Sequence, residues 1–229
     1  MTKSSPRLPG PKVRNPPQEP KPWDVLPVRA QGDESAEPLY TAVGAALTQW
    51  EKLEGVHANL FGILVGSRRG AAVRAFGTVA ASATRVGMVV AAAEVVLAED
   101  EQLMSETLQI LKDSVSFSPR RNEIAHGVVN HWTETHTDAA GVVEQFDHGH
   151  FLLPAGYAVK YRSTKERAFA SPITEAGKYA YTADQVMTYA ERFARHYSAA
   201  VKIMFKVLAY VEQNWTKPSS KMAEGVEDI

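Results

Sequence analysis

The chain has 229 residues, no cysteine, and 25 Lys and Arg against 26 Asp and Glu, which gives a formal net charge of -1. This length predicts one core with room for an insertion rather than two full domains. The lack of cysteine excludes a disulfide scaffold, a thiolate zinc site and a cysteine nucleophile. The near-neutral charge gives the whole chain no attraction to nucleic acid or to an anionic membrane, so binding a polyanion requires a local site.

The first 36 residues are rich in proline and in basic side chains. Residues 1–30 carry six Lys and Arg against two acidic groups, and nine prolines lie between positions 6 and 38. Because proline lacks a backbone donor and fixes φ, we expect residues 1–36 to form a disordered or polyproline-like arm outside the fold, from which Trp23 could dock on the core or on a partner. No apolar stretch follows the basic start, so the pattern does not resemble a signal peptide.

Three helical segments are predicted after this arm. Apolar residues recur every three or four positions over 39–64, which predicts an amphipathic helix of about 27 residues. Residues 71–98 are rich in small side chains that allow close helix approach, so we expect a second, central and heavily buried helix. Asp100 is the predicted N-cap of a third helix, in which apolar positions repeat over 103–115.

A short helix is predicted next. Ser118 and Pro119 match an N-cap and a first helical residue, and Gly127 matches a C-terminal stop. These signals bracket a helix over residues 119–126.

After Gly127 the hydrophobic period changes. β-branched and aromatic runs typical of a small antiparallel meander occur at 128–132, 141–153 and 158–162. A capping box at 182–185 then opens a last helix that continues to residue 215.

The predicted fold is mainly α: a helical bundle of four to five helices with a small antiparallel β insertion at about residues 128–181. Residues 37–216 are expected to form a single domain, and 217–229 a flexible C-terminal tail. The most apolar stretch, 86–98, has only 13 residues and contains Glu94. It is too short for a membrane span, so we expect a soluble, cytoplasmic protein with no membrane partner.

The predicted short helix carries the densest group of reactive side chains: Arg120, Arg121, Asn122, Glu123 and His126. Asn122 and His126 are four residues apart and share a helix face, so the amide can orient the imidazole. Arg121 and His126 are about 140° apart around the axis, so they meet only if both reach one groove. The negative end of the helix dipole favours the charged imidazole and the nearby arginines oppose it, which suits general acid-base work near neutral pH.

The motif Arg121-Asn122-x-x-x-His126-Gly127 resembles the signature of the HEPN superfamily. In that family an Arg with a polar follower precedes a His by four to six intervening residues, and here four intervene. Family members are bundles of about four α-helices with the motif near the start of a late helix. The resemblance covers residues 39–127 and 182–215 and leaves the arm and the β insertion without a family counterpart.

The resemblance implies a metal-independent endoribonuclease without a cofactor. The RNA 2′-OH attacks the adjacent phosphate and gives a 2′,3′-cyclic phosphate and a free 5′-OH. His126 would be the general base or acid, Arg121 would stabilise the charge of the transition state, and Asn122 would orient His126 or bind phosphate. Arg120 would bind substrate by adding phosphate affinity. DNA lacks the 2′-OH and should not be cut.

The resemblance also implies partners. Family members commonly dimerise so that two motifs face each other across one cleft, which would place two Arg120-Arg121 pairs in a local basic site. We therefore expect RNA as the substrate, a homodimer, and a toxin or phage-defence setting with a cognate antitoxin or another protein partner.

A second hypothesis keeps the bundle without the catalysis. His126 would bond the last helix carbonyls, and Arg120 and Arg121 would be solvated or paired with Glu123 and its neighbours. The chain would then be a non-catalytic HEPN-like module that binds a nucleotide, a phosphate or a protein partner. Glu94 is a supporting candidate, expected to pair with Arg121 or Arg85 in a structural ion pair.

The remaining histidines suggest a metal site only weakly. Asp147-His148-Gly149-His150 places two imidazoles two residues apart, with His131 and His136 upstream. Gly149 favours a turn in which both rings point to water, so we predict no metal.

Overall fold

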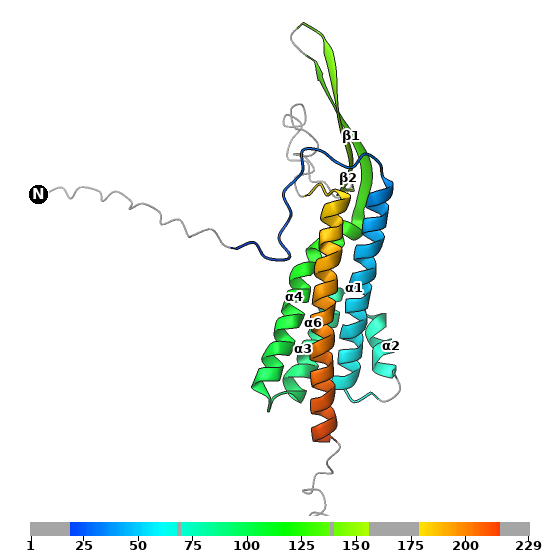
Figure 1. Cartoon of the computed structure of the whole chain (residues 1–229). Helices are drawn as coiled ribbons and strands as arrows, with labels where there is room; N and C mark the ends of the chain where they lie inside the picture. The colour runs from blue at the N-terminus through cyan, green and yellow to red at the C-terminus, as the bar shows by residue number, and fades with distance from the viewer. Residues whose placement is uncertain (1–18, 68–69, 138–139, 156–178, 216–229) are drawn as a thin grey trace, which may run out of the picture.

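The computed structural model describes residues 19–67, 70–137, 140–155 and 179–215. Within them the chain forms five helices and a two-stranded antiparallel sheet (Figure 1). The elements are α1 (Glu37–Leu64), α2 (Ala71–Thr78), α3 (Ser82–Val96), α4 (Glu101–His126), β1 (Gly127–Thr137), β2 (Val143–Pro154) and α6 (Ala183–Trp215). The mainly α bundle with a small antiparallel β insertion is confirmed. The expected third strand at 158–162 and the tail at 217–229 lie outside the described residues.

The bundle is organised around α1 and α6, which lie side by side and run in the same direction (Figure 1). α4 runs the opposite way and continues directly into β1. The core between α1 and α6 is aromatic: Trp50 and Phe193 are buried, and their ring centroids lie 5.3 Å apart. Burial of each such side chain contributes about 1.5–3 kcal/mol. None of the described helices is both long and apolar enough to cross a membrane.

Residues 101–126 form one continuous helix, so the prediction of a separate helix that begins at Ser118 is wrong. Pro119 lacks the N–H that would bind the Val115 carbonyl. Both residues are exposed, so water can solvate the freed carbonyl while Phe117 keeps the opposite side of α4 buried. The predicted cap at Asp100 is confirmed, because its Oδ1 accepts the Leu103 N–H at 2.9 Å.

Two helices, α2 and α3, replace the single helix predicted over 71–98. The chain breaks at Val79, which is extended (φ -80°, ψ 114°). Arg85 stabilises the break, because its Nε donates to the Val79 carbonyl at 2.7 Å and its Nη1 binds Glu54 of α1 at 2.9 Å. α3 buries only one stripe of small apolar residues and leaves Val95 79% exposed, so it is not the central, heavily buried helix expected.

Residues 19–36 pack against the bundle, whereas the sequence predicted an arm outside the fold up to residue 36. Trp23 contacts Phe117 of α4 edge-on, with ring centroids 5.6 Å apart. The Tyr189 hydroxyl of α6 accepts the Leu26 N–H at 3.0 Å and donates to the Asp24 carbonyl at 2.8 Å. Residues 1–18 lie outside the described part of the chain.

The prolines do not prevent this docking, because proline loses its N–H but keeps its carbonyl acceptor. Gln185 of α6 donates to the Pro27 carbonyl at 2.7 Å, and Arg192 donates to the Pro22 carbonyl at 2.7 Å. The segment is therefore held largely through its backbone carbonyls, which accept hydrogen bonds from side chains of α6.

Asp33 connects this N-terminal segment to α6 and to the hairpin that β1 and β2 form. Its backbone exchanges hydrogen bonds of 2.9 and 2.7 Å with His150 of β2. Its carboxylate accepts the Ala183 N–H at 2.7 Å at the start of α6. The preceding Gly32 passes so close to β2 that a Cβ would lie 2.4 Å from the His150 carbonyl oxygen, so only glycine fits there.

A buried polar cluster joins the three long helices. Ser114 of α4 lies between His57 of α1 and His196 of α6, with its Oγ 3.1 and 2.8 Å from the two Nε2 atoms, and it also donates to the Ile110 carbonyl. A hydroxyl has one proton and two lone pairs, and this proton goes to Ile110, so both imidazoles donate to Ser114 through Nε2–H. Burial lowers the pKa of His57 to about 4, and it also lowers the pKa of His196, against the nearby carboxylates of Glu54 and Asp113. Both rings are therefore neutral at neutral pH.

We predict that Ser114→Ala destabilises the fold by about 1–3 kcal/mol, because two buried imidazoles lose their shared partner. Ser116→Ala is the matched control, since this serine bonds the carbonyl four residues back at the surface of the same helix. It should change stability by less than about 0.5 kcal/mol. Urea unfolding followed by far-UV circular dichroism measures both, and equal effects would contradict the role of the cluster.

Stability should also fall as the pH drops from about 6.5 to about 4. In this window the unfolded chain protonates its histidines, while His57 stays largely neutral in the fold because its pKa is lowered to about 4; the lowered pKa of His196 acts in the same direction. His57 alone accounts for a loss of about 2 kcal/mol between pH 7 and pH 5. His57→Gln keeps hydrogen-bonding capacity without titrating, so it should flatten the dependence of the urea midpoint on pH. An unchanged pH profile would show that His57 is not responsible.

Candidate active site

The Arg-Asn-x-x-x-His motif lies at the C-terminal end of α4, where the helix turns into β1. Asn122 and His126 are both exposed on the face that also carries Val115 and Pro119. Among the described residues His126 makes no hydrogen bond or ion pair. The shared face expected from their four-residue spacing is thus present, with the imidazole open to solvent.

Arg121 points toward α1. Its Nη1 donates to Asn122 Oδ1 at 3.2 Å, and its Nη2 lies 3.6 Å from Glu51 Oε1 of α1. The side chain is 30% exposed, and its buried Nε has no partner in the described structure. Glu51 was missed by sequence reasoning, because nothing in its local pattern distinguishes it from any solvated helix residue.

Arg120 points in another direction, into the protein. The residue is 9% exposed, and its Nη2 binds Glu123 Oε1 at 2.7 Å. This position differs from the prediction that Arg120 binds substrate: consecutive helix residues project about 100° apart, so only one of the two arginines can face the α1 side. Arg120 therefore has a structural role, and one motif contributes one arginine to the surface.

Glu123 is the centre of the buried network that holds Arg120. Its Oε2 accepts the Tyr181 hydroxyl at 2.7 Å, and its carbonyl accepts the Tyr179 hydroxyl at 3.0 Å. The tyrosine rings stack with centroids 5.0 Å apart. Burial, and then the hydrogen bond to the Glu123 carboxylate, raise the pKa of Tyr181, so this hydroxyl remains a donor. Neither tyrosine was singled out from the sequence, because both follow Glu123 by more than 50 residues.

Gly127 ends α4 as predicted, but not through a left-handed cap. Its backbone is extended (φ -71°, ψ 156°). A Cβ there would lie 2.7 Å from the Leu152 side chain and 2.8 Å from the Glu123 carbonyl oxygen. Glycine is thus required by the close approach of β2, and it fixes how His126 leaves the helix.

Glu94 does not support the site. It is exposed on α3 and makes no ion pair in the described part of the chain. Arg85, one of its two expected partners, binds Glu54 instead, and the other, Arg121, lies beside Glu51. α3 does form a structural ion pair, but through Arg85 and the Glu54 carboxylate of α1 and not through Glu94.

The hairpin histidines contact carboxylates and backbone. His131 Nε2 lies 2.9 Å from Asp147 Oδ1, and His148 Nε2 lies 3.4 Å from Glu134 Oε2. His150 Nδ1 lies 3.3 Å from the Asp33 carbonyl. No group of three potential metal ligands occurs among the described residues.

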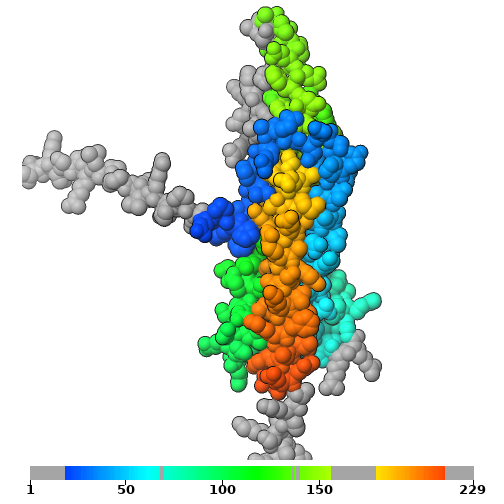
Figure 2. All heavy atoms as spheres, in the orientation of Figure 1, coloured from blue at the N-terminus to red at the C-terminus, as the bar shows by residue number. Residues whose placement is uncertain are grey.

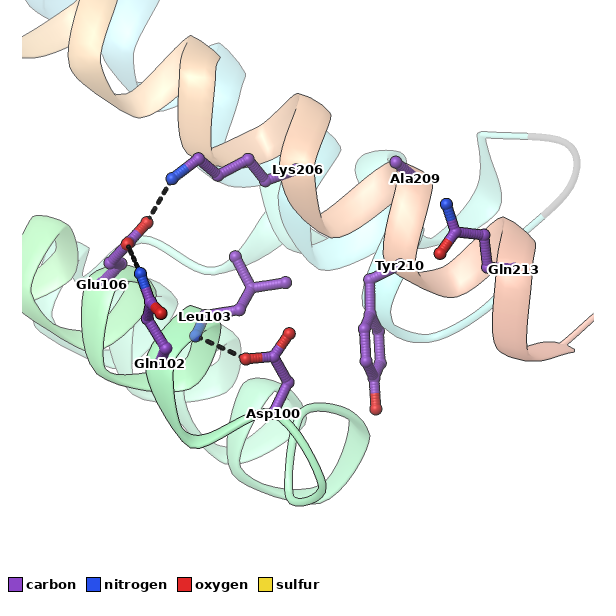
Figure 3. Close-up of a pocket in the computed structure, with 8 residues that line it drawn as sticks. All are labelled: Asp100, Gln102, Leu103, Glu106, Lys206, Ala209, Tyr210 and Gln213. Carbon is purple, nitrogen blue, oxygen red and sulfur yellow. Dashed lines mark hydrogen bonds and ion pairs between the residues drawn. The ribbon is translucent and has the colours of Figure 1, made fainter.

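Two cavities lie away from the motif. One, of about 370 Å³, lies between the start of α4 and the end of α6 (Figure 3), where Lys206 donates to Glu106 at 2.6 Å and Gln102 donates to the same side chain. These hydrogen bonds lower the pKa of Glu106. The other, of about 560 Å³, lies between the N-terminal ends of α1 and α6 and is lined by Pro38 and Met187 among others. No motif residue lines either cavity.

The structure therefore brings Arg121 and Asn122 together and leaves His126 separate and open. Comparison with known proteins adds no relative: no family model, curated protein or solved structure matches the chain. The likeness to the HEPN superfamily rests on the motif and on the helical bundle that carries it.

We predict that Glu123→Gln destabilises the fold by about 3 kcal/mol, because Arg120 loses its counter-charge in a largely buried position. Adding Arg120→Met should recover at least half of this loss, since the unpaired charge is then removed. Arg195→Ala, which removes an exposed arginine of α6, is the control and should change stability by less than about 0.5 kcal/mol. If the double variant is no more stable than Glu123→Gln, the pair does not have this role.

Proposed function

We propose that this chain is a HEPN-like, metal-independent endoribonuclease that acts as a homodimer in the cytoplasm. The observation that carries the proposal is the exposed His126, which has no partner among the described residues and shares a helix face with Asn122, while Arg121 donates to Asn122 at the edge of that face. These are the three residues of the motif. A toxin or phage-defence role with a cognate antitoxin follows from the resemblance alone.

In the proposed reaction the 2′-OH of RNA attacks the neighbouring phosphorus and the bond to the 5′ oxygen of the next nucleotide breaks. His126 takes the proton of the 2′-OH or gives a proton to the leaving oxygen. Arg121 donates to the non-bridging phosphate oxygens as negative charge develops there. Asn122 holds Arg121 through its Oδ1 and leaves its amide N–H groups for phosphate.

A second subunit would bring together the two side chains that lie apart in one chain, Arg121 and His126. In one chain Arg121 is directed to Glu51 of α1, while His126 faces solvent. A copy placed with its motif opposite would set the His126 of one chain against the Arg121 of the other. Because Arg120 is engaged with Glu123, the cleft would contain two surface arginines and not four.

The non-catalytic alternative also has an observation in its favour, the Arg121–Glu51 contact, which already gives the guanidinium a counter-charge. In that case the surface binds a nucleotide, a phosphate or a protein partner. Binding would be saturable and weakened by Arg121→Ala, without cleavage.

The test is cleavage of total RNA by the purified chain in the presence of EDTA. We expect fragments with 2′,3′-cyclic phosphate and 5′-OH ends by mass spectrometry, and no cleavage of DNA. His126→Ala should reduce the rate about 100-fold or more, because proton transfer is lost. His131→Ala, at another exposed imidazole, should leave the rate unchanged.

Intact RNA with the wild-type chain, or equal rates for His126→Ala and wild type, would overturn the enzymatic proposal. Native mass spectrometry tests the shared cleft separately. A monomer that still cleaves would contradict the two-subunit site while keeping the ribonuclease.

A further inference from the structure

The two edges of the hairpin differ. On the outer side of β2, Leu152 exchanges hydrogen bonds with Tyr181, and His150 does so with Asp33. In an antiparallel ladder, residues whose backbone groups point away from the partner strand lie opposite residues that also point away. Val129 and His131, which pair with these two, therefore direct their N–H and C=O groups to the outer side of β1, where no described residue pairs with them.

The open edge continues toward the tip of the hairpin. The register shifts between Trp132 and Thr133, and the extra residue, His148, lies on β2, so the alternation along β1 is not interrupted. Thr133, Thr135 and Thr137 thus also point their backbone groups outward, and nothing in the described ranges pairs with them. A row of backbone groups without a partner strand is a template for an added strand.

The hairpin extends beyond the end of the bundle (Figures 1 and 2). Its outer half exposes apolar side chains: Val142 is 55% exposed, Val143 62% and Phe146 46%. A two-stranded hairpin by itself is only marginally stable in water, and a third strand on β1 would add backbone hydrogen bonds to it.

The charge of the hairpin indicates which kind of segment would suit its open edge as a third strand. Residues 127–155 contain Glu134, Asp138, Glu144 and Asp147, and no Lys or Arg. In the register of the hairpin, Glu134 lies opposite Phe146, and Thr133 lies opposite Asp147. Paired residues share a face and neighbours in a strand lie on opposite faces, so Glu134 and Asp147 are on different faces and each face carries a carboxylate. Two of these carboxylates already contact histidines of the hairpin, Asp147 with His131 and Glu134 with His148. With those imidazoles neutral the hairpin is acidic, so it repels RNA phosphates and a second identical hairpin and attracts Lys and Arg.

We propose that the open edge of β1 binds an extended, basic segment of a protein partner as a third strand. Backbone hydrogen bonds to the outward-facing residues from Val129 to Thr137 provide the pairing. Lys or Arg side chains of the segment contact Glu134 of β1 and reach across β1 toward Glu144 and Asp147 of β2. This surface is distinct from the motif and does not depend on ribonuclease activity.

The experiment uses the full chain and a fluorescent eight-residue peptide of alternating Lys and Val, with binding measured by fluorescence anisotropy. We expect saturable binding. A Glu-Val peptide, and a Lys-Val peptide N-methylated at alternate residues, should each bind about tenfold more weakly or worse, because the first loses the charge match and the second loses the backbone donors.

Two matched variants test whether the peptide binds along the edge of β1. Thr135→Pro removes an outward N–H without removing a bond between β1 and β2, whereas Thr135→Val keeps the N–H. Only the proline variant should weaken binding, by about tenfold, with an unchanged melting temperature as the test of folding. Glu144→Lys should weaken the Lys-Val peptide and strengthen the Glu-Val peptide.

The proposal is overturned if no peptide binds, or if the N-methylated peptide binds as well as the parent, which would mean attraction by charge without strand pairing. It is also overturned if Thr135→Pro converts a dimer to a monomer in sedimentation velocity, since the occupant is then a second copy. Displacement of the peptide by single-stranded RNA, with the same sensitivity to Thr135→Pro, would assign the edge to nucleic acid instead.

Discussion

The packing of α1 along α6 is the contact on which the rest of the structure depends. It buries Trp50 and Phe193 between two long parallel helices, and α4 packs antiparallel against both. Ser114 then fixes the position of α4, because its hydroxyl meets His57 and His196 at one point in the core. Once α4 is held there, its C-terminal end, its turn into β1 and the direction of the motif side chains are determined.

The geometry of a helix also explains why the motif does not act as one cluster. Adjacent residues project about 100° apart, so five consecutive or near-consecutive polar side chains must point to different surroundings. Arg120 enters the core and needs Glu123 and Tyr181 to make its charge tolerable, since an unpaired buried guanidinium would be strongly destabilising. Arg121 reaches the surface beside α1, and His126 reaches solvent. The dense group of polar side chains at the end of α4 thus divides into two parts. Arg120 and Glu123 stabilise the fold, and Arg121 and His126 lie at the surface.

Local periodicity was sufficient to predict α1 and α6, because a stripe of apolar residues over about 30 positions leaves few alternatives. It failed where a local signal was outweighed by tertiary contacts. Pro119 was interpreted as a helix start, yet an exposed proline is tolerated when the opposite helix face is buried. The N-terminal segment was interpreted as outside the fold because of its prolines, but α6 provides donors for their carbonyls. The shared helix face of Asn122 and His126 followed from their spacing, whereas their exposure and the roles of Arg120 and Glu51 depend on residues far away in the sequence.

The hairpin and the motif are mechanically linked although their charges suit different partners. His126 is the last residue of α4, and Gly127 opens β1 with no linker between them. The close approach of Leu152 to Gly127 then sets the angle between helix and strand. Any partner that orders β1 therefore restricts the backbone next to the exposed imidazole, although it binds an acidic surface that RNA would avoid. For the proposed ribonuclease, a basic segment bound at β1 would therefore act on the backbone beside His126 without competing for the phosphate that is proposed to bind Arg121.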